Sequence, residues 1–249
     1  MHDSDTKIPS LQTMLQNARL LLACSALVVS LPAQLTSAHP VVFEQGTAIM
    51  GHHHGDMAGV EVIHSPRWWY GIGLDAERTE SSSTILARAN ALVWRGNFPD
   101  LQSNLYLGVA AGVAWGTLSD HTSQKSETEA RIEGSSHKNE RSGVQSWSVE
   151  WDAEDRQYYA KARHEQFFKN EQLFTNETVA RLGIAPYKAQ ADEPTLWTMV
   201  EWQVHSNAKL ENPHHEVTPL IRYFYRNMLF EVGSSLTGKL KFNYMIHYF

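Results

Sequence analysis

Apolar and polar residues alternate along most of the chain beyond residue 55, in segments of about nine to thirteen residues. In 101–116, for example, Leu107 and Val109 fall on one face, and Asn104 and Gly108 fall on the other. Successive side chains of a strand point to opposite faces, so this pattern predicts strands. We find no competing apolar period of 3.6 residues over a helical length.

Eleven alternating segments follow residue 57, and the stretch 43–51 adds a twelfth. The clearest segments are 68–78, 84–95, 101–116, 157–168, 195–206, 216–226 and 240–248. Transmembrane barrels of bacteria have an even number of strands. We therefore predict twelve strands, and ten if one segment is merged or lost.

Two further patterns favour a membrane barrel over a soluble sandwich. Aromatic residues crowd the segment ends, as in the girdles at the two membrane surfaces: Trp68, Trp69, Trp94, Phe98, Trp115, Phe167, Phe168, Phe174, Tyr187, Trp197, Tyr225 and Tyr248. Connection lengths also alternate, as in barrels with short periplasmic turns and long external loops. The predicted short joins are 65–67, 96–100, 153–155 and 226–227, and the longer ones are 80–83, 118–143, 169–172 and 207–215.

The N-terminal 38 residues have the pattern of a secretory signal peptide. Arg19 precedes an apolar run over 20–31, and small residues end at Ala38. We predict cleavage after Ala38, which leaves 39–249 as a single exported domain, with Met14 as the alternative start of the chain. With the strand pattern, this predicts an all-β antiparallel transmembrane barrel in a bacterial outer membrane, with 118–143 as its long external loop.

Composition excludes several classes of protein. The net charge of −6 argues against nucleic acid as a partner, because phosphate binding needs a basic face. No apolar run reaches about 18 residues, which excludes a bundle of membrane helices. Cys24, the single cysteine, lies inside the predicted signal, so the exported domain would contain none.

Several stretches resemble a known family. They are 39–43 (HPVVF), Gly46, Met50, 64–66 (HSP) and 97–107 (NFPDLQSNLYL). They resemble a poorly characterised family of bacterial outer-membrane proteins, associated with gene neighbourhoods for copper and other heavy-metal handling. The resemblance implies a β-barrel in a metal-related setting and supplies no catalytic residue.

Two histidine-rich clusters are the candidate metal site. Imidazole binds copper and zinc, and a thioether favours cuprous ion. We expect both clusters in external loops, where binding would be weak because adjacent loop residues are not held in a fixed geometry; the alternative is that they are hydrophilic loop residues. No cofactor is required. The candidate ligands are His52, His53, His54, Asp56, Met57, His214 and His215.

Charged residues of both signs fall on the face opposite the apolar one, where they would line the lumen. In a narrow barrel such charges either pair across the lumen and plug it or form a selective pore. The predicted lumen charges are Glu61, Asp75, Glu77, Arg88, Glu150, Lys161, Arg163, Glu165, Glu177, Arg181, Glu201, Arg222 and Glu231.

The sequence therefore predicts a non-enzymatic outer-membrane barrel for metal-ion handling or small-solute passage. The alternatives are a soluble periplasmic barrel or sandwich that binds a metal or small ligand, and a lipid-modifying barrel enzyme. Pairs of His and Ser occur at 64–65, 121 and 123, and 205–206, and such pairs arise by chance.

The expected partners are outer-membrane lipid and the barrel-assembly machinery, and the oligomeric state stays open. The machinery would bind the last strand, which ends at Phe249 and resembles the sorting signal of outer-membrane barrels. The apolar residues Tyr244, Ile246 and Tyr248 are one step out of phase with that terminal Phe.

Overall fold

A computed structural model describes residues 39–116, 141–189, 193–207 and 213–248. The predicted signal peptide, most of the predicted loop 118–143, and Phe249 lie outside these residues. Within them, no helix is long and apolar enough to cross a membrane.

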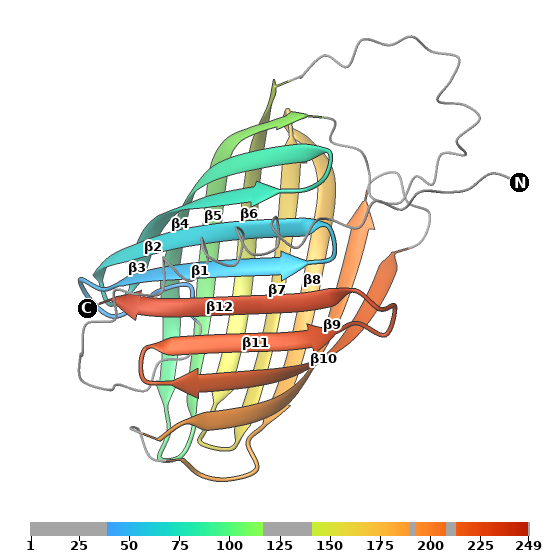
Figure 1. Cartoon of the computed structure of the whole chain (residues 1–249). Helices are drawn as coiled ribbons and strands as arrows, with labels where there is room; N and C mark the ends of the chain where they lie inside the picture. Colours follow the sequence, from blue (N-terminus) through green and yellow to red (C-terminus); the bar gives the residue numbers. More distant parts are fainter. Residues whose placement is uncertain (1–38, 117–140, 190–192, 208–212, 249) are drawn as a thin grey trace, which may run out of the picture. The chain divides into compact units, whose positions relative to one another are not determined.

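Twelve antiparallel strands close into a barrel in the described part of the chain (Figure 1). Each strand pairs with its neighbours in sequence, and β1 pairs with β12 to close the sheet. The prediction of twelve strands is confirmed. The strands are β1 (Thr47–His54), β2 (Met57–Arg67), β3 (Tyr70–Arg78), β4 (Ser82–Asn97), β5 (Gln102–Gly116), β6 (Arg141–Glu154), β7 (Tyr158–Lys169), β8 (Gln172–Ile184), β9 (Thr195–Asn207), β10 (His214–Tyr225), β11 (Met228–Ser234) and β12 (Leu240–Tyr248).

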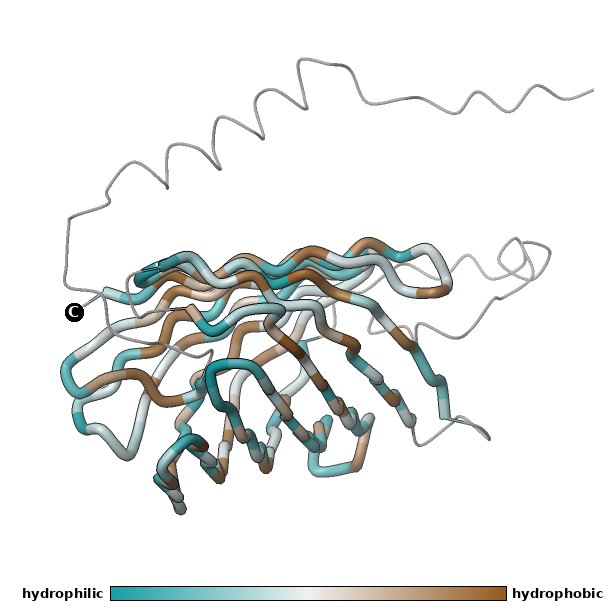
Figure 2. The backbone as a smooth tube through the Cα atoms, turned by 90° about the horizontal axis from the view of Figure 1, so that it is seen from below, coloured by the Kyte–Doolittle hydropathy of each residue, from teal (hydrophilic) through white to brown (hydrophobic). Residues whose placement is uncertain are grey.

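The alternation in sequence corresponds to the two faces of the sheet. On β5, Leu107 and Val109 are exposed on the outside, while Tyr106 and Ala110 are buried in the lumen. Apolar and polar residues alternate along the strands in Figure 2. The barrel therefore carries its apolar residues outward and its polar ones inward, as the fold class predicted from sequence requires.

Because the strands are antiparallel neighbours, every second connection falls at the same end of the barrel. We call the end with the β2–β3, β4–β5, β6–β7, β8–β9 and β10–β11 connections the β2–β3 end, and the opposite one the β1–β2 end. The predicted short joins all lie at or beside connections of the β2–β3 end, and the longer ones lie at the β1–β2 end.

The predicted joins are wrong at two places, and one long connection was not predicted. The β7–β8 join, predicted as long, is a two-residue turn at Asn170 (φ 48°) and Glu171 (φ 67°), the backbone of a tight hairpin. The β8–β9 connection, 185–194, is long although it lies at the β2–β3 end. Residues 141–143, assigned to the loop 118–143, begin β6 because they continue its pairing with β5.

Inside the barrel, three small apolar clusters gather towards the β2–β3 end. Most of their members come from the halves of the strands nearest that end, Ala185 follows β8, and two clusters include residues that precede β1. The clusters are Val42, Ala48, Phe224, Leu229 and Met245; Tyr159, Ala185, Trp197, Met199 and Leu220; and Val41, Leu92 and Tyr106. Much of the remaining lumen is lined by charged and polar side chains.

Candidate functional site in the barrel lumen

Inward-facing positions of ten strands bring most of the predicted lumen charges, with Lys241, together into two groups. We call them the Arg88 group, on β2, β3, β4, β6 and β7, and the Glu231 group, on β8 to β12. Among the described residues, the first comprises Glu61, Asp75, Arg88, Glu150, Lys161, Arg163 and Glu165, and the second Arg181, Glu201, Arg222, Glu231 and Lys241.

Arg88 is the centre of the first group. Its Nε lies 3.3 Å from Glu61 Oε1 on β2, and its Nη2 lies 3.3 Å from Asp75 Oδ2 on β3. Its Nη1 lies 3.1 Å from Glu165 Oε1 on β7, beyond the intervening strands β5 and β6. One guanidinium thus pairs with carboxylates of three strands, β2, β3 and β7, and charge pairs line this part of the lumen.

The same group continues on β6 and β7. Lys161 Nζ lies 2.8 Å from Glu150 Oε1, and Arg163 forms an ion pair with Glu165. Arg163 Nε also lies 4.0 Å from Glu150 Oε2. Its side chain is 35% exposed, so this cation has open space beside it.

The Glu231 group lies on the other half of the wall. Glu231 accepts a hydrogen bond from Arg181 Nη1 at 2.9 Å and one from Arg222 Nε at 2.7 Å. Glu201 is paired with both Arg181 and Lys241. Lys241 was not among the predicted lumen charges, although its place opposite Leu240 and Phe242 in the alternation indicated an inward side chain.

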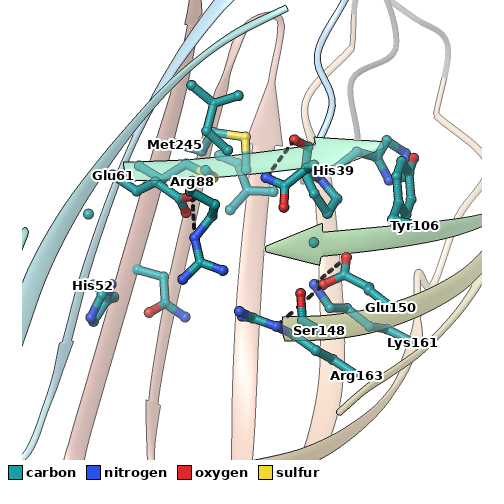
Figure 3. Close-up of a pocket in the computed structure, with 18 of the residues that line it drawn as sticks. His39, His52, Glu61, Arg88, Tyr106, Ser148, Glu150, Lys161, Arg163 and Met245 are labelled. Atoms are coloured by element: carbon teal, nitrogen blue, oxygen red, sulfur yellow. Dashed lines mark hydrogen bonds and ion pairs between the residues drawn. The ribbon is translucent and has the colours of Figure 1, made fainter. Parts of the chain in front are cut away.

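A cavity of about 200 Å³ lies between the two groups (Figure 3). In the close-up, Arg88 lies beside Glu61, and Lys161 lies beside Glu150. Such a space admits water and small ions. The charged side chains that line it are Glu61, Arg88, Glu150, Lys161, Arg163 and Glu231.

The three consecutive histidines do not form one ligand set. They belong to β1, not to an external loop, so their side chains alternate: His52 and His54 share a face with buried Ala48, and His53 is on the other face. His54 Nε2 lies 3.2 Å from Glu216 Oε1, and His52 Nε2 lies 3.8 Å from Glu77 Oε2. The predicted loop position is wrong because the backbone there continues pairing with both β2 and β12.

The second cluster is also divided between faces. His214 and His215 are the first residues of β10, and His215 stacks on Trp202 with ring centroids 5.8 Å apart. Asp56 occupies the β1–β2 turn, and Met57 begins β2. Within the described residues, no three His, Cys, Asp or Glu side chains converge as metal ligands. Weak copper or zinc binding by these residues stays a prediction.

His39 was not recognised as a candidate from the sequence. Its Nδ1 lies 2.8 Å from Asp152 Oδ2 on β6, and Asn104 Nδ2 donates to Asp152 Oδ1, also at 2.8 Å. Burial lowers the pKa of His39, but the hydrogen bond and charge of Asp152, with Glu154 nearby, outweigh it and raise that pKa. Asp152 lies two residues after Glu150 on β6 and points to the same face. The alternation alone therefore predicted that the Asp152 side chain points into the lumen.

Comparison with protein families finds no match, and comparison with curated proteins finds none either. Among solved structures, the chain is similar to the KdgM porin in complex with disordered oligogalacturonate, with 10% identity and a TM-score of 0.48 over 82% of this chain and 98% of that chain. It is similar to the KdgM porin on its own, with 10% identity and a TM-score of 0.47 over the same shares. The translocator domain of the autotransporter NalP from Neisseria meningitidis has 11% identity and a TM-score of 0.40, over 95% of this chain and 94% of that one.

At these identities and TM-scores the comparisons carry no argument about activity. The fold rests on the strand pairing, which closes an all-β barrel of the outer-membrane type. The copper association implied by the sequence resemblance stays a prediction.

Proposed function

We propose that this chain is a non-enzymatic outer-membrane barrel that passes small ions and solutes through a narrow, charge-lined lumen. The observation that carries the proposal is the distribution of side chains, with apolar residues on the outer face of the barrel and charged residues inside it. Val109 and Leu182 on the outer face are 59% and 67% exposed, whereas Glu201 and Glu231 in the lumen are 1% and 3% exposed. A soluble barrel or sandwich has the opposite arrangement, so this observation favours a surrounding of lipid.

The lumen also limits what can pass. Ion pairs line each half of its wall at the level of Arg88, and the space between the two groups is about 200 Å³. Water and small hydrated or partly dehydrated ions fit such a space, whereas large solutes need side chains to move. The charge pairs therefore act as a filter between the two halves of the lumen.

Acidic side chains at the β1–β2 end favour cations. Glu77 lies beside His52, Glu177 beside His205, and Glu216 beside His54, with distances of 3.8, 3.9 and 3.2 Å. Lys239 is the cation near Glu216, at 3.9 Å, and its side chain is 49% exposed. Rings of carboxylates select cations in channels, so we infer a preference for small cations.

Nothing in the described site favours the enzyme alternative. His64 and Ser65 are consecutive residues of β2, and His205 and Ser206 are consecutive residues of β9. Consecutive strand residues point to opposite faces, so neither pair acts as a nucleophile and its base. His121 and Ser123 lie outside the described residues.

The test has two stages. The protein should fractionate with the outer membrane, require detergent for extraction, and migrate differently on a gel before and after heating. Refolded protein in a planar bilayer should then give small, discrete conductance steps with a reversal potential that favours cations. Glu77→Gln with Glu177→Gln should reduce that preference, while Glu171→Gln, on an exposed turn at the same end, should not.

Two results would overturn the proposal. Recovery of the protein in the soluble fraction without detergent refutes the membrane location. If inserted, heat-modifiable protein gives no conductance steps either as wild type or as the Val41→Asp variant, passage is refuted and a purely structural barrel remains.

A further inference from the structure

The segment before β1 turns into the lumen at the β2–β3 end. Gln45 N donates to Ser65 O at 2.7 Å, and Ser65 N donates to Gly46 O at 2.9 Å, which fixes the base of the segment on β2. Gly46 N then donates to Phe43 O at 2.8 Å, which closes a turn. Val42 N donates to Ser65 Oγ at 3.0 Å, and the residues before it leave the wall.

Two valines of this segment are buried among side chains of the barrel interior. Val41 is 4% exposed and forms a cluster with Leu92 of β4 and Tyr106 of β5. Val42 is 7% exposed and belongs to a cluster that includes Met245 of β12. The two clusters lie on different arcs of the wall, so the segment crosses the bore.

Polar contacts hold the tip of the segment. Asn90 Nδ2 donates to the carbonyl oxygen of Pro40 at 3.2 Å. His39 reaches Asp152 on β6 with a 2.8 Å contact, and its ring lies 5.7 Å from that of Tyr106. His39 and Pro40 also line the 200 Å³ cavity, and Figure 3 shows His39 beside Tyr106 at its edge.

We propose that residues 39–43 form a plug that closes the lumen at the β2–β3 end, and that release of the plug opens a path to the cavity. This inference rests on the proposed function, since a plug matters only if the lumen conducts. The segment belongs to no strand and is held by a few side-chain contacts at its tip. Such a segment opens locally at far lower cost than the surrounding sheet.

The first test expels the plug. Val41→Asp places a carboxylate among Leu92 and Tyr106, where burial of an unpaired charge is strongly unfavourable. We expect the single-channel conductance or open probability to rise severalfold over the wild type. Leu101→Asp is the matched control, because it adds the same charge at the same end on an exposed turn. It should leave both quantities unchanged.

The second test fixes the plug with a disulfide and compares the oxidised and reduced forms of the same variant. Val42→Cys with Ser65→Cys, in a chain with Cys24→Ser, introduces a disulfide where a backbone nitrogen and a side-chain oxygen are now 3.0 Å apart. We expect oxidation to lower the open probability severalfold and dithiothreitol to restore it. Each single-cysteine variant should show no response to either treatment.

The outcomes separate the plug from the proposed function. If the wild type conducts and both Val41→Asp and the oxidised disulfide leave its conductance unchanged, the plug is refuted while passage stands. If inserted, heat-modifiable wild type and Val41→Asp both fail to conduct, passage itself is refuted. If Val41→Asp does not fold, the double-cysteine protein tests the plug alone. A rise in its open probability on addition of dithiothreitol supports the plug, and no change refutes it.

Discussion

Replacement of Glu231 by Gln tests whether the lumen charges stabilise the barrel as pairs. Glu231 is 3% exposed and accepts hydrogen bonds from Arg181, Arg222 and Asn243 at 2.9, 2.7 and 2.8 Å. Gln keeps the shape of the side chain but removes its charge. Arg181 retains Glu201, whereas Arg222 keeps no carboxylate partner among the described residues.

The expected loss of unfolding free energy depends on this difference between Arg181 and Arg222. Removal of one partner of a buried ion pair destabilises a protein by about 3–5 kcal/mol, because the other charge stays buried and unpaired. Since Arg181 keeps Glu201, we expect the lower end, about 3 kcal/mol. Arg222→Met should cost about 1.5–3 kcal/mol, the value of a hydrogen bond to a charged group, because Glu231 keeps Arg181.

The double variant carries the decisive information. Glu231→Gln with Arg222→Met leaves no unpaired charge at this position, so its cost should fall short of the sum of the two single variants. The expected difference is about 1–3 kcal/mol, within the range for coupled neighbours.

The assay is equilibrium unfolding in urea from lipid vesicles, followed by fluorescence of the eight tryptophans. Arg67→Met is the control, because its pair with Glu44 has a comparable 2.9 Å distance but side chains that are 63% and 42% exposed. It should cost less than about 1 kcal/mol. Additive costs in the double variant, or a loss from Glu231→Gln no larger than the control's, would refute the reasoning.

Three further predictions concern the outer face, strand packing and pH. Val109→Arg places a charge on the lipid face near the middle of β5 and should cost about 2–4 kcal/mol in vesicles; an unchanged urea midpoint contradicts a membrane location. Gly112→Ala should destabilise the barrel by about 1–3 kcal/mol, since the added Cβ meets the backbone oxygen of Ile85 on β4; a heat-modification midpoint equal to that of the wild type contradicts this. Burial lowers the pKa of His39, but the hydrogen bond and charge of Asp152 raise it by more. The pKa of His39 in the folded protein therefore lies above the ordinary 6.5. The stabilisation by His39 is then complete below about pH 6.5 and is lost as the pH rises through the raised pKa. A stability difference from His39→Asn that widens towards alkaline pH contradicts the ion pair.

The faces of the strands could be predicted from the sequence because they depend only on the local backbone. A strand directs successive side chains to opposite sides whatever its partners, so Leu107 and Val109 could be assigned to one face and Gly108 to the other. The same rule placed Arg88 and Glu231 inside. Local geometry also explains one error: His52 and His54 were assigned to a loop, because nothing in their own sequence shows that β1 continues its pairing with β12.

Contacts between strands could not be predicted in this way. The pair of Arg88 and Glu165 joins residues 77 positions apart, and they meet because twelve strands and their register set the width of the lumen. The contact of His39 with Asp152 spans 113 positions and requires the segment before β1 to turn inward. The sequence by itself thus determined which residues face lipid and which face the lumen. Only the closed barrel decided which charges meet inside it and which segment crosses its end, because closure alone fixes the distances between strands that are remote in the chain.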